Sequence, residues 1–336
     1  MSIVVPQWVP KAPLEPLRLD WLTRAGVELA VLRLDLIDSL ISGNKWFKLT
    51  EHLLAAAAAG ADGLISLGGA HSNHLHALAA AGRRFSFPTA GLLRGEPQDT
   101  PTVRDLQAWG MRLHWLGYGG YRARHRPEFW AEWQARYPTL HAVPEGGGGL
   151  PGALGCAALL SLAREQLATL GWIDYDGWWL AVGTGTTLAG LVLAEAGAHP
   201  VFGALAVPAG HGVAQQVQAI LRQAGVADRG YRLLDACRGG FAKVDAELTR
   251  CIFEVEACSG LPLEPLYTAK ALMALRQQVE AGYFPSGTRL LLVHTGGLQG
   301  RRAAHMTNEP MPLRNLAEPL VGDAKPRLVE SGYLYE

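Results

Sequence analysis

Short apolar runs alternate with longer runs rich in alanine and leucine through most of this chain. The short runs have the length of buried strands, and the longer runs repeat apolar residues at helical spacing. Repeated alternation of this kind predicts an α/β fold with mostly parallel, doubly wound sheets. We expect strands at 27–34, 63–67, 89–93, 112–116, 177–182, 201–207 and 289–294, and helices at 45–59, 72–82, 103–110, 154–170 and 188–196.

Two segments interrupt this alternation. Gly146 to Gly149 is a run of glycines, which is typical of a linker or of a hinge between domains. The segment 303–336 contains several prolines and little periodicity. We expect it to be irregular and to lie on the surface or on a partner subunit.

The charge balance disfavours some classes of partner. Lys and Arg number 30 and Asp and Glu number 30, so no basic field favours nucleic acid or a membrane surface. The N-terminus lacks the pattern of a signal peptide, and no apolar run is long enough to span a bilayer. The cysteines form no CxxC pair, which is typical of reduced thiols, and we expect a cytoplasmic protein.

A glycine–threonine segment, Gly183-Thr184-Gly185-Thr186-Thr187, follows one expected strand and precedes a helix. Backbone N–H groups at a helix start, with hydroxyls beside them, suit a phosphate dianion. The segment lacks the GxGxxG and GxxxxGK[ST] spacings, which disfavours a dinucleotide or nucleoside triphosphate site. A plain strand-to-helix turn with threonine caps is the structural alternative.

A second polar turn, Gly68-Gly69-Ala70-His71-Ser72-Asn73-His74, follows the strand expected at 63–67. Its donors would lie at the carboxyl end of a strand, where open α/β sheets bind ligands. The alternative is that Ser72 or Asn73 only caps the next helix. His71, His74 and His76 have no carboxylate or cysteine near them in sequence, so we favour pocket-lining or solvated histidines over a zinc site.

Lys45 and Lys48 fall at the start of the helix expected at 45–59, where a cation is poorly placed. A lysine amine becomes nucleophilic when it is desolvated or lies beside another positive charge. The position of these lysines is therefore explained if one of them is a buried, reactive amine.

Together these segments resemble the pyridoxal 5'-phosphate (PLP)-dependent family of 1-aminocyclopropane-1-carboxylate (ACC) deaminase and D-cysteine desulfhydrase, which has the tryptophan-synthase-β (fold type II) architecture. The resemblance extends from about residue 14 to residue 302. Six segments in the family order are a specific signal. They are Ser42-Gly43-Asn44-Lys45-x-x-Lys48-Leu49, Ser66-Leu67-Gly68-Gly69-x-x-Ser72-Asn73-His74, Pro144-Glu145-Gly146-Gly147, Gly183-Thr184-Gly185-Thr186-Thr187-x-Ala189-Gly190, Pro265-Leu266-Tyr267-Thr268-x-Lys270 and His294-Thr295-Gly296-Gly297.

The resemblance implies a role for each matching residue. Lys45 would bind PLP as a Schiff base and move the α-proton of the substrate. Asn73 would hydrogen-bond the phenolic oxygen of PLP, and Ser72 would bind the substrate carboxylate. Tyr267 would lie at the ring and the substrate. The remaining cofactor contacts would be Gly183, Thr184, Gly185, Thr186 and Thr187 at the phosphate, and Thr268 at the pyridine nitrogen with Thr295 nearby.

Two positions distinguish the branches of this family. ACC deaminases carry Glu where this chain has Thr268 and Leu where it has Thr295, so the pair resembles the D-cysteine desulfhydrase branch. Phe241 falls where both branches carry tyrosine, and it lacks the acid/base hydroxyl. Its segment could recognise another side chain through Arg238 or Lys243, although solvated surface charges are the alternative.

We therefore expect PLP-dependent elimination from a small amino acid, as in D-cysteine desulfhydrase, with a thiol, ammonia and a 2-oxo acid as products. The alternatives are ACC deamination, a racemase or dehydratase of the same fold, and a non-catalytic PLP-binding protein. The resemblance also implies a homodimer of two-domain subunits. The larger domain would comprise residues 1–49 and 153–336, and the smaller domain residues 50–152.

Overall fold

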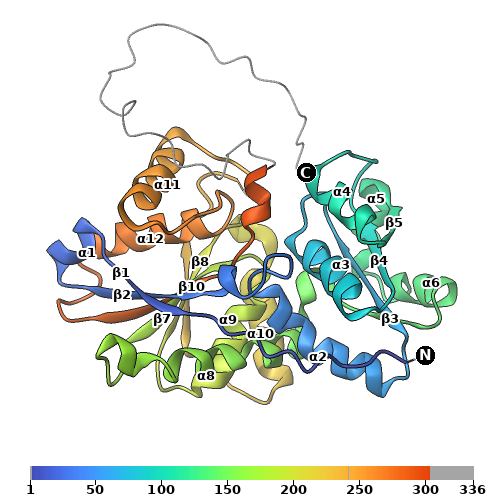
Figure 1. Ribbon diagram of the computed structural model, residues 1–336, viewed down its shortest axis with the longest axis horizontal. Helices are drawn as coiled ribbons and strands as arrows, with labels where there is room; N and C mark the ends of the chain where they lie inside the picture. The colour runs from blue at the N-terminus through green and yellow to red at the C-terminus, as the bar shows by residue number, and fades with distance from the viewer. Residues whose placement is uncertain (1, 241, 303–336) are drawn as a thin grey trace, which may run out of the picture.

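The computed structural model describes residues 2–240 and 242–302, which form two sheets with helices packed around each (Figure 1). The smaller sheet has the strand order β5-β4-β3-β6 and is parallel throughout. Its strands are β3 (Gly63–Gly68), β4 (Thr89–Leu93), β5 (Arg112–Trp115) and β6 (Leu140–Ala142). Around it lie α3 (Asn73–Phe85), α4 (Pro101–Ala108), α5 (Gly117–Arg122) and α6 (Phe129–Arg136).

The larger sheet has the order β1-β2-β10-β7-β8-β9, and β1 is antiparallel to β2 while the other pairs are parallel. Leu290 of β10 pairs with Leu29 of β2 on one side and with Gly177 of β7 on the other, so distant parts of the chain form its centre. The strands are β1 (Leu14–Leu17), β2 (Glu28–Arg33), β7 (Gly177–Val182), β8 (Val201–Leu205), β9 (Tyr231–Asp235) and β10 (Arg289–His294).

Helices cover both faces of the larger sheet. Every residue of β7 is buried, because a strand covered on two sides needs apolar residues on both. One face carries α8 (Ala158–Arg164), α9 (Thr186–Glu195) and α10 (Val213–Gln223), and the other carries α1 (Asp20–Ala25), α11 (Ala246–Ser259) and α12 (Thr268–Glu280) (Figure 1). The predicted α/β fold with mostly parallel, doubly wound sheets is confirmed.

Two helices connect the layers around the sheets. α2 (Lys45–Ala58) packs against α3 and α7 (Gly149–Cys156), and α7 packs against α9. Short 3-10 segments occupy several connections: η1 (Leu34–Leu36), η2 (Ala123–His125), η3 (Glu145–Gly147), η4 (Leu167–Leu170), η5 (Ala209–His211) and η6 (Leu298–Arg302). The carboxyl ends of β3, β7 and β10 lead directly into the segments that contain Asn73, Gly183 and Thr295.

The bounds of the helix expected at 154–170 are wrong, and of the two interpretations of the glycine run the linker is wrong while the hinge stays a prediction. The long helix expected at 154–170 is instead α7, α8 and η4, because hydrogen bonds tighten to i→i+3 around Ala157. α7 also begins earlier, at Gly149, since Pro151 in a first helical turn needs no hydrogen-bonded N–H. The glycine run is not a free linker, because Gly147 is buried against Lys48 and His74.

Three remaining findings concern membrane spans, cysteines and the residues that the structure does not describe. Within residues 2–240 and 242–302, no helix is both long and apolar enough to cross a membrane. The cysteines of the same ranges are unpaired. Phe241 and the segment 303–336 lie outside the described residues.

Candidate active site

Lys45 is the first residue of α2 and lies close to the glycine–threonine segment. Its Nζ donates a hydrogen bond to Asn44 Oδ1 at 2.8 Å, and Asn44 Nδ2 donates to Thr187 Oγ1 at 2.8 Å. The Asn44 N–H donates to the Thr295 carbonyl at 3.2 Å. The structure thus brings Lys45, Thr187 and Thr295 together from three distant parts of the sequence.

The Lys45 amine lies where its charged form is disfavoured. Desolvation is the main cause, and the positive charge of Lys48 adds to it, so that the pKa of Lys45 falls to about 7. Cys156 and Glu264 act in the opposite direction with smaller effects. About half of such lysines are neutral at pH 7, and the neutral amine is the nucleophile that a Schiff base requires.

The segment Gly183–Thr187 forms the turn between β7 and α9. Gly185 has a φ of 76° and precedes Thr186, the first residue of the helix. The Thr184 and Thr186 hydroxyls lie 3.1 Å apart, and the buried Lys48 places its Nζ 3.4 Å from Thr184 Oγ1. Helix N–H groups, hydroxyls and a buried cation make the donor set that a phosphate needs. Lys48 joins this set, although the sequence analysis considered it only as a candidate reactive amine and not as a phosphate ligand.

Ser72 and Asn73 lie at the start of α3. Ser72 is the N-cap, and its Oγ accepts a hydrogen bond from the Leu75 N–H at 3.2 Å. This confirms the capping interpretation, while the hydroxyl proton can still donate to another group. Asn73 Nδ2 points toward Gly297, where an added Cβ would stand only 2.7 Å from it. The loops after β3 and β10 therefore approach each other at Asn73.

Two of the three histidines of this region, His74 and His76, are bonded to protein side chains. His74 Nε2 lies 2.8 Å from Ser66 Oγ, and His76 Nε2 lies 3.0 Å from Asp105 Oδ2. Burial, with the charges of Lys45 and Lys48, holds the pKa of His74 well below its ordinary value. In the part of the chain that the structure describes, no three His, Cys, Asp or Glu side chains group as metal ligands do.

Tyr267 and Thr268 lie at the start of α12. Thr268 Oγ1 accepts from the Glu264 N–H at 2.8 Å and donates to the Glu264 carbonyl at 3.2 Å. The Tyr267 ring lies against Gly183, where an added Cβ would stand 3.0 Å from Cε1. The structure thus places Tyr267 beside the phosphate-type turn, and it commits the Thr268 hydroxyl to its own helix start.

Glu264 is a buried carboxylate that the sequence analysis missed. Its oxygens accept hydrogen bonds from the N–H groups of Leu266, Tyr267 and Thr268, at 2.8, 2.6 and 2.6 Å. Burial raises the pKa of Glu264 to about 7, although these bonds and the charge of Lys45 oppose the shift. A carboxylate just before a helix start can accept from the first N–H groups of that helix, and this signal could have found Glu264.

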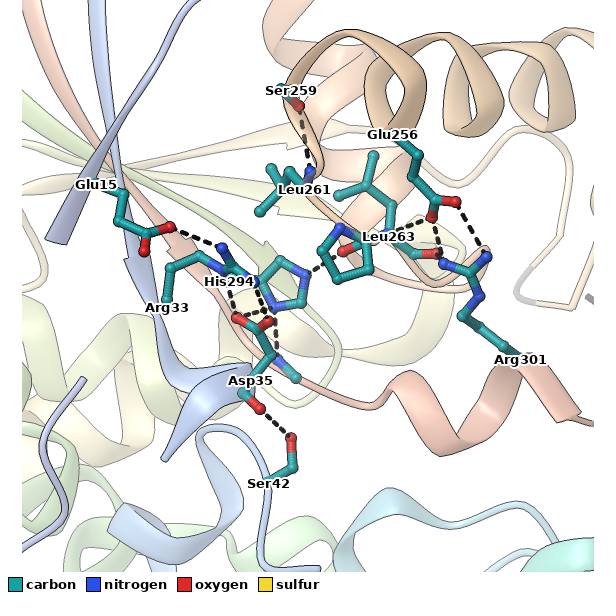
Figure 2. A network of polar contacts seen from close by, with 12 residues as sticks. Glu15, Arg33, Asp35, Ser42, Glu256, Ser259, Leu261, Leu263, His294 and Arg301 are labelled. Carbon is teal, nitrogen blue, oxygen red and sulfur yellow. Dashed lines mark hydrogen bonds and ion pairs between the residues drawn. The ribbon is translucent and has the colours of Figure 1, made fainter. Parts of the chain in front are cut away.

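Figure 2 shows a network that we call the buried ionic network and define as the buried Arg33, Asp35 and His294 with the half-exposed Glu15. Arg33 donates to both oxygens of Asp35, at 2.9 and 2.6 Å, and to Glu15 Oε2 at 2.7 Å. Burial lowers the pKa of His294, whose Nδ1 lies 3.1 Å from Asp35 Oδ1. Its Nε2 donates to the Pro262 carbonyl at 2.7 Å. The ends of β2 and β10 are thereby joined.

Two glycines complete the contact above this network. Gly43 has a φ of 83°, and a Cβ there would stand 2.1 Å from the Thr295 carbonyl oxygen. Gly296 has a φ of 75°, and a Cβ there would stand 2.5 Å from the Gly43 Cα. Only glycine permits both the left-handed backbone and this close approach. The pair lets the Lys45 loop lie directly on the Thr295 loop.

The segment that was expected to read the substrate side chain is only partly described. Arg238 donates to Asp245 at 2.8 Å and to Glu247 at 2.6 Å, so its guanidinium is committed to surface carboxylates. Lys243 is exposed. Phe241, which falls where both branches of the family carry tyrosine, is among the residues not described.

The residues present fit PLP. They offer a desolvated amine of lowered pKa at Lys45, a phosphate donor set at Lys48 and Gly183–Thr187, and an amide NH₂ at Asn73. The faces beside Tyr267 and Asn73 stay open because residues 183 and 297 are glycines. PLP needs an amine nucleophile, a phosphate site and partners at its ring, and these groups can supply each of them.

Comparisons with known proteins agree with this fit. The sequence model of the family "Pyridoxal-phosphate dependent enzyme" matches residues 8–296. A protein of Pyrococcus abyssi named "Putative 1-aminocyclopropane-1-carboxylate deaminase" is 28% identical over 286 residues, which cover 82% of this chain and 86% of that protein. A protein of Thermotoga maritima with the same name is 28% identical over 292 residues, covering 82% and 90%.

Solved structures share the fold. The crystal structure of an ACC deaminase homologue is similar with a TM-score of 0.76 and 24% identity, covering 91% of this chain and 95% of that one. A hydrogen sulfide-producing enzyme from Fusobacterium nucleatum is similar with a TM-score of 0.64 and 12% identity, covering 88% and 96%. The sequence-based expectations of a PLP-dependent family, of PLP itself and of fold type II are confirmed.

Proposed function

This chain belongs to the family of pyridoxal-phosphate dependent enzymes, and from that premise we propose that it eliminates a thiol from a small D-amino acid, as D-cysteine desulfhydrase does. With D-cysteine, the substrate and one water give pyruvate, ammonia and hydrogen sulfide. When bound, PLP withdraws electrons from the substrate Cα and makes its proton acidic.

The observation that carries this choice is the neutral hydroxyl of Thr268, which accepts from the Glu264 N–H and donates to the Glu264 carbonyl at the start of α12. A carboxylate at this position would keep the pyridine nitrogen protonated and strengthen the electron sink. The opening of a cyclopropane ring releases no good leaving group, whereas β-elimination releases a thiolate. Ring opening therefore depends more on a strong electron sink than thiolate loss does. Thr268, with Thr295 beside the Lys45 loop, therefore favours β-elimination over ACC deamination.

Each remaining site residue has a role in the proposal. Lys45 Nζ takes the α-proton and gives it to the departing thiolate, because a pKa of about 7 leaves the amine able to accept and to donate a proton near neutral pH. Ser72 and the N–H groups at the start of α3 bind the substrate carboxylate. Tyr267 packs at the cofactor ring and the substrate. Lys48 and Gly183–Thr187 hold the phosphate, with Asn73 at the phenolic oxygen.

ACC deamination is the second candidate. The names of the relatives from Pyrococcus abyssi and Thermotoga maritima support it. It differs in product, since ACC would yield 2-oxobutanoate and ammonia without sulfide. A racemase or dehydratase would use the same Lys45. Product analysis with D- and L-serine and D- and L-alanine would detect either activity.

The proposal includes the organisation of the molecule. We place the larger domain at residues 1–49 and 153–336 and the smaller at 50–152, and the two separate sheets support this division. Homodimeric assembly and a cytoplasmic location also belong to the proposal. The segment 303–336, which was expected to be irregular, lies outside the described residues.

Substrate screening tests the reaction. The purified protein is incubated with D- and L-cysteine, ACC, and D- and L-serine and alanine, and sulfide and 2-oxo acids are measured. We expect sulfide and pyruvate from D-cysteine at the highest rate. Robust 2-oxobutanoate from ACC with negligible sulfide would replace the proposal with its second candidate.

Replacement of Lys45 tests the site. In Lys45→Ala we expect a folded protein without the visible absorbance of covalently bound PLP, and activity lower by about 10³-fold or more. The exposed Lys11 offers a matched control, and Lys11→Ala should keep both properties. An unchanged spectrum and rate in Lys45→Ala would exclude this site.

A further inference from the structure

Asn73 and Gln299 come from elements of different sheets and meet at the site. Asn73 begins α3 beside the smaller sheet, and Gln299 lies in η6 after β10 of the larger sheet. Gln299 Nε2 donates a hydrogen bond to Asn73 Oδ1 at 2.7 Å. Residues 2–240 and 242–302 give Asn73 no other side-chain hydrogen bond.

This bond fixes the orientation of the Asn73 amide. An asparagine amide has an accepting oxygen at one corner and a donating NH₂ at the other. Because Oδ1 is held by Gln299, Nδ2 points away from it, toward Gly297. A Cβ at position 297 would stand 2.7 Å from Nδ2, so the glycine leaves the NH₂ accessible to a ligand.

We propose that Gln299 is a positioning residue, which turns the NH₂ group of Asn73 rather than its oxygen toward the phenolic oxygen of bound PLP. The inference rests on the proposed function, since that function makes Asn73 the partner of this oxygen. An ionised phenolic oxygen only accepts hydrogen bonds, so it is stabilised by the NH₂ and repelled by the amide oxygen.

The same segment offers a matched control. Arg302 also lies in η6, and its guanidinium pairs with Asp105 of α4, whose Oδ2 is 3.0 Å from His76 Nε2. η6 is therefore joined to the layer around the smaller sheet at two points. The Gln299 contact meets Asn73 directly, whereas Arg302 contacts Asp105 instead. Replacing Arg302 weakens the connection without changing the partner of Asn73.

The test uses the PLP-loaded protein and two variants, Gln299→Glu and Arg302→Gln. A carboxylate at 299 only accepts hydrogen bonds, so it must take one from Asn73 Nδ2, which turns Oδ1 toward the phenolic oxygen. The visible absorbance is followed against pH, and the affinity for PLP is measured after its removal and return.

We expect Gln299→Glu to weaken PLP binding about tenfold and to move the absorbance transition up by about one pH unit. Arg302→Gln should change neither by more than about twofold. In an Asn73→Ala background, Gln299→Glu should have no further effect, because the contact is already lost. Wild-type spectra and affinity in Gln299→Glu, or equal changes in both single variants, would overturn the inference.

Two further measurements keep the outcomes distinct. If Gln299→Glu does not fold, as judged by circular dichroism, Gln299→Met decides by the same measurements. It should bind PLP about threefold more weakly, and unchanged binding would exclude the role. The proposed function fails separately, if Lys45→Ala keeps the absorbance of covalently bound PLP or if the wild-type protein leaves D-cysteine unchanged.

Discussion

The site lies between two connections of very different kinds. On one side the buried ionic network joins the ends of β2 and β10, with the side chains of Asp35 and His294 0% and 1% exposed. On the other side η6 meets α4 through Arg302 and Asp105, whose side chains are 45% and 23% exposed. Water can replace the exposed partners at little cost, whereas the buried charges have no substitute. The loops around Lys45 are therefore held by buried interactions, whereas the segment that contacts Asn73 is held in part by an exposed ion pair.

The largest expected difference between the two connections is in stability. Asp35→Ala leaves the buried Arg33 with one carboxylate partner fewer, and we expect a loss of about 3–5 kcal/mol in the free energy of unfolding. Denaturant unfolding measures it. Asp99→Ala, which breaks an exposed pair with Arg104, is the control and should cost about 1 kcal/mol or less. Equal losses in the two variants would remove the distinction.

The pH at which Lys45 begins to capture PLP should depend on its buried setting and not on the exposed Arg302–Asp105 pair. Only the neutral amine captures PLP, and a pKa of about 7 places the midpoint there rather than at 10.5. The capture rate of the PLP-free protein should therefore rise about tenfold per pH unit below pH 7 and level off above it. Stopped-flow absorbance follows the reaction. Arg302→Gln should keep this midpoint, and a midpoint near 10 in the wild type would contradict the desolvated setting.

Replacing Glu264 should shift the pH midpoint of PLP capture by Lys45, and this shift should be smaller than the effects above. Its charge raises the pKa of Lys45, so Glu264→Gln should move the capture midpoint to lower pH. The glutamine oxygen can still accept from the Tyr267 and Thr268 N–H groups, which keeps the helix start. Glu254→Gln on the exposed face of α11 is the control. A midpoint that stays or rises in Glu264→Gln would contradict the predicted direction.

The smallest effect is expected at η6. Arg302→Gln should cost about 0–1 kcal/mol in the free energy of unfolding, because its partner Asp105 keeps His76 and water. Hydrogen exchange of α3 and α4 should nevertheless increase, since one of the two links to η6 is lost. Unchanged exchange in both helices would show that the Gln299 link alone holds them.

The strands were the most predictable part of the fold. The strands at 89–93, 177–182 and 289–294 have the predicted bounds, because buried parallel strands are continuous apolar runs. β1, β6 and β9 were missed, since edge strands have fewer apolar residues to signal them. The end of α7 was missed because Cys156 and Ala158 on either side of Ala157 give no local signal for a tightened turn.

The candidate site was predictable only where the sequence signal is local. The glycine–threonine turn and Lys45 have local patterns, and the structure places them together. Gln299 has no such pattern, because its importance comes from Asn73, which is distant in sequence. Asp35 and His294 become partners only when β2 and β10 pair. The assigned catalytic roles stay predictions.

The contact between Gly43 and Gly296 restricts how this protein can change over time. Neither position can accept even an alanine without moving the other loop. Substitution at one cannot be repaired at the other, since glycine is already the smallest residue. In a deep mutational scan, both positions should therefore tolerate no replacement, and variation around Lys45 should be confined to side chains that leave these two backbones in contact.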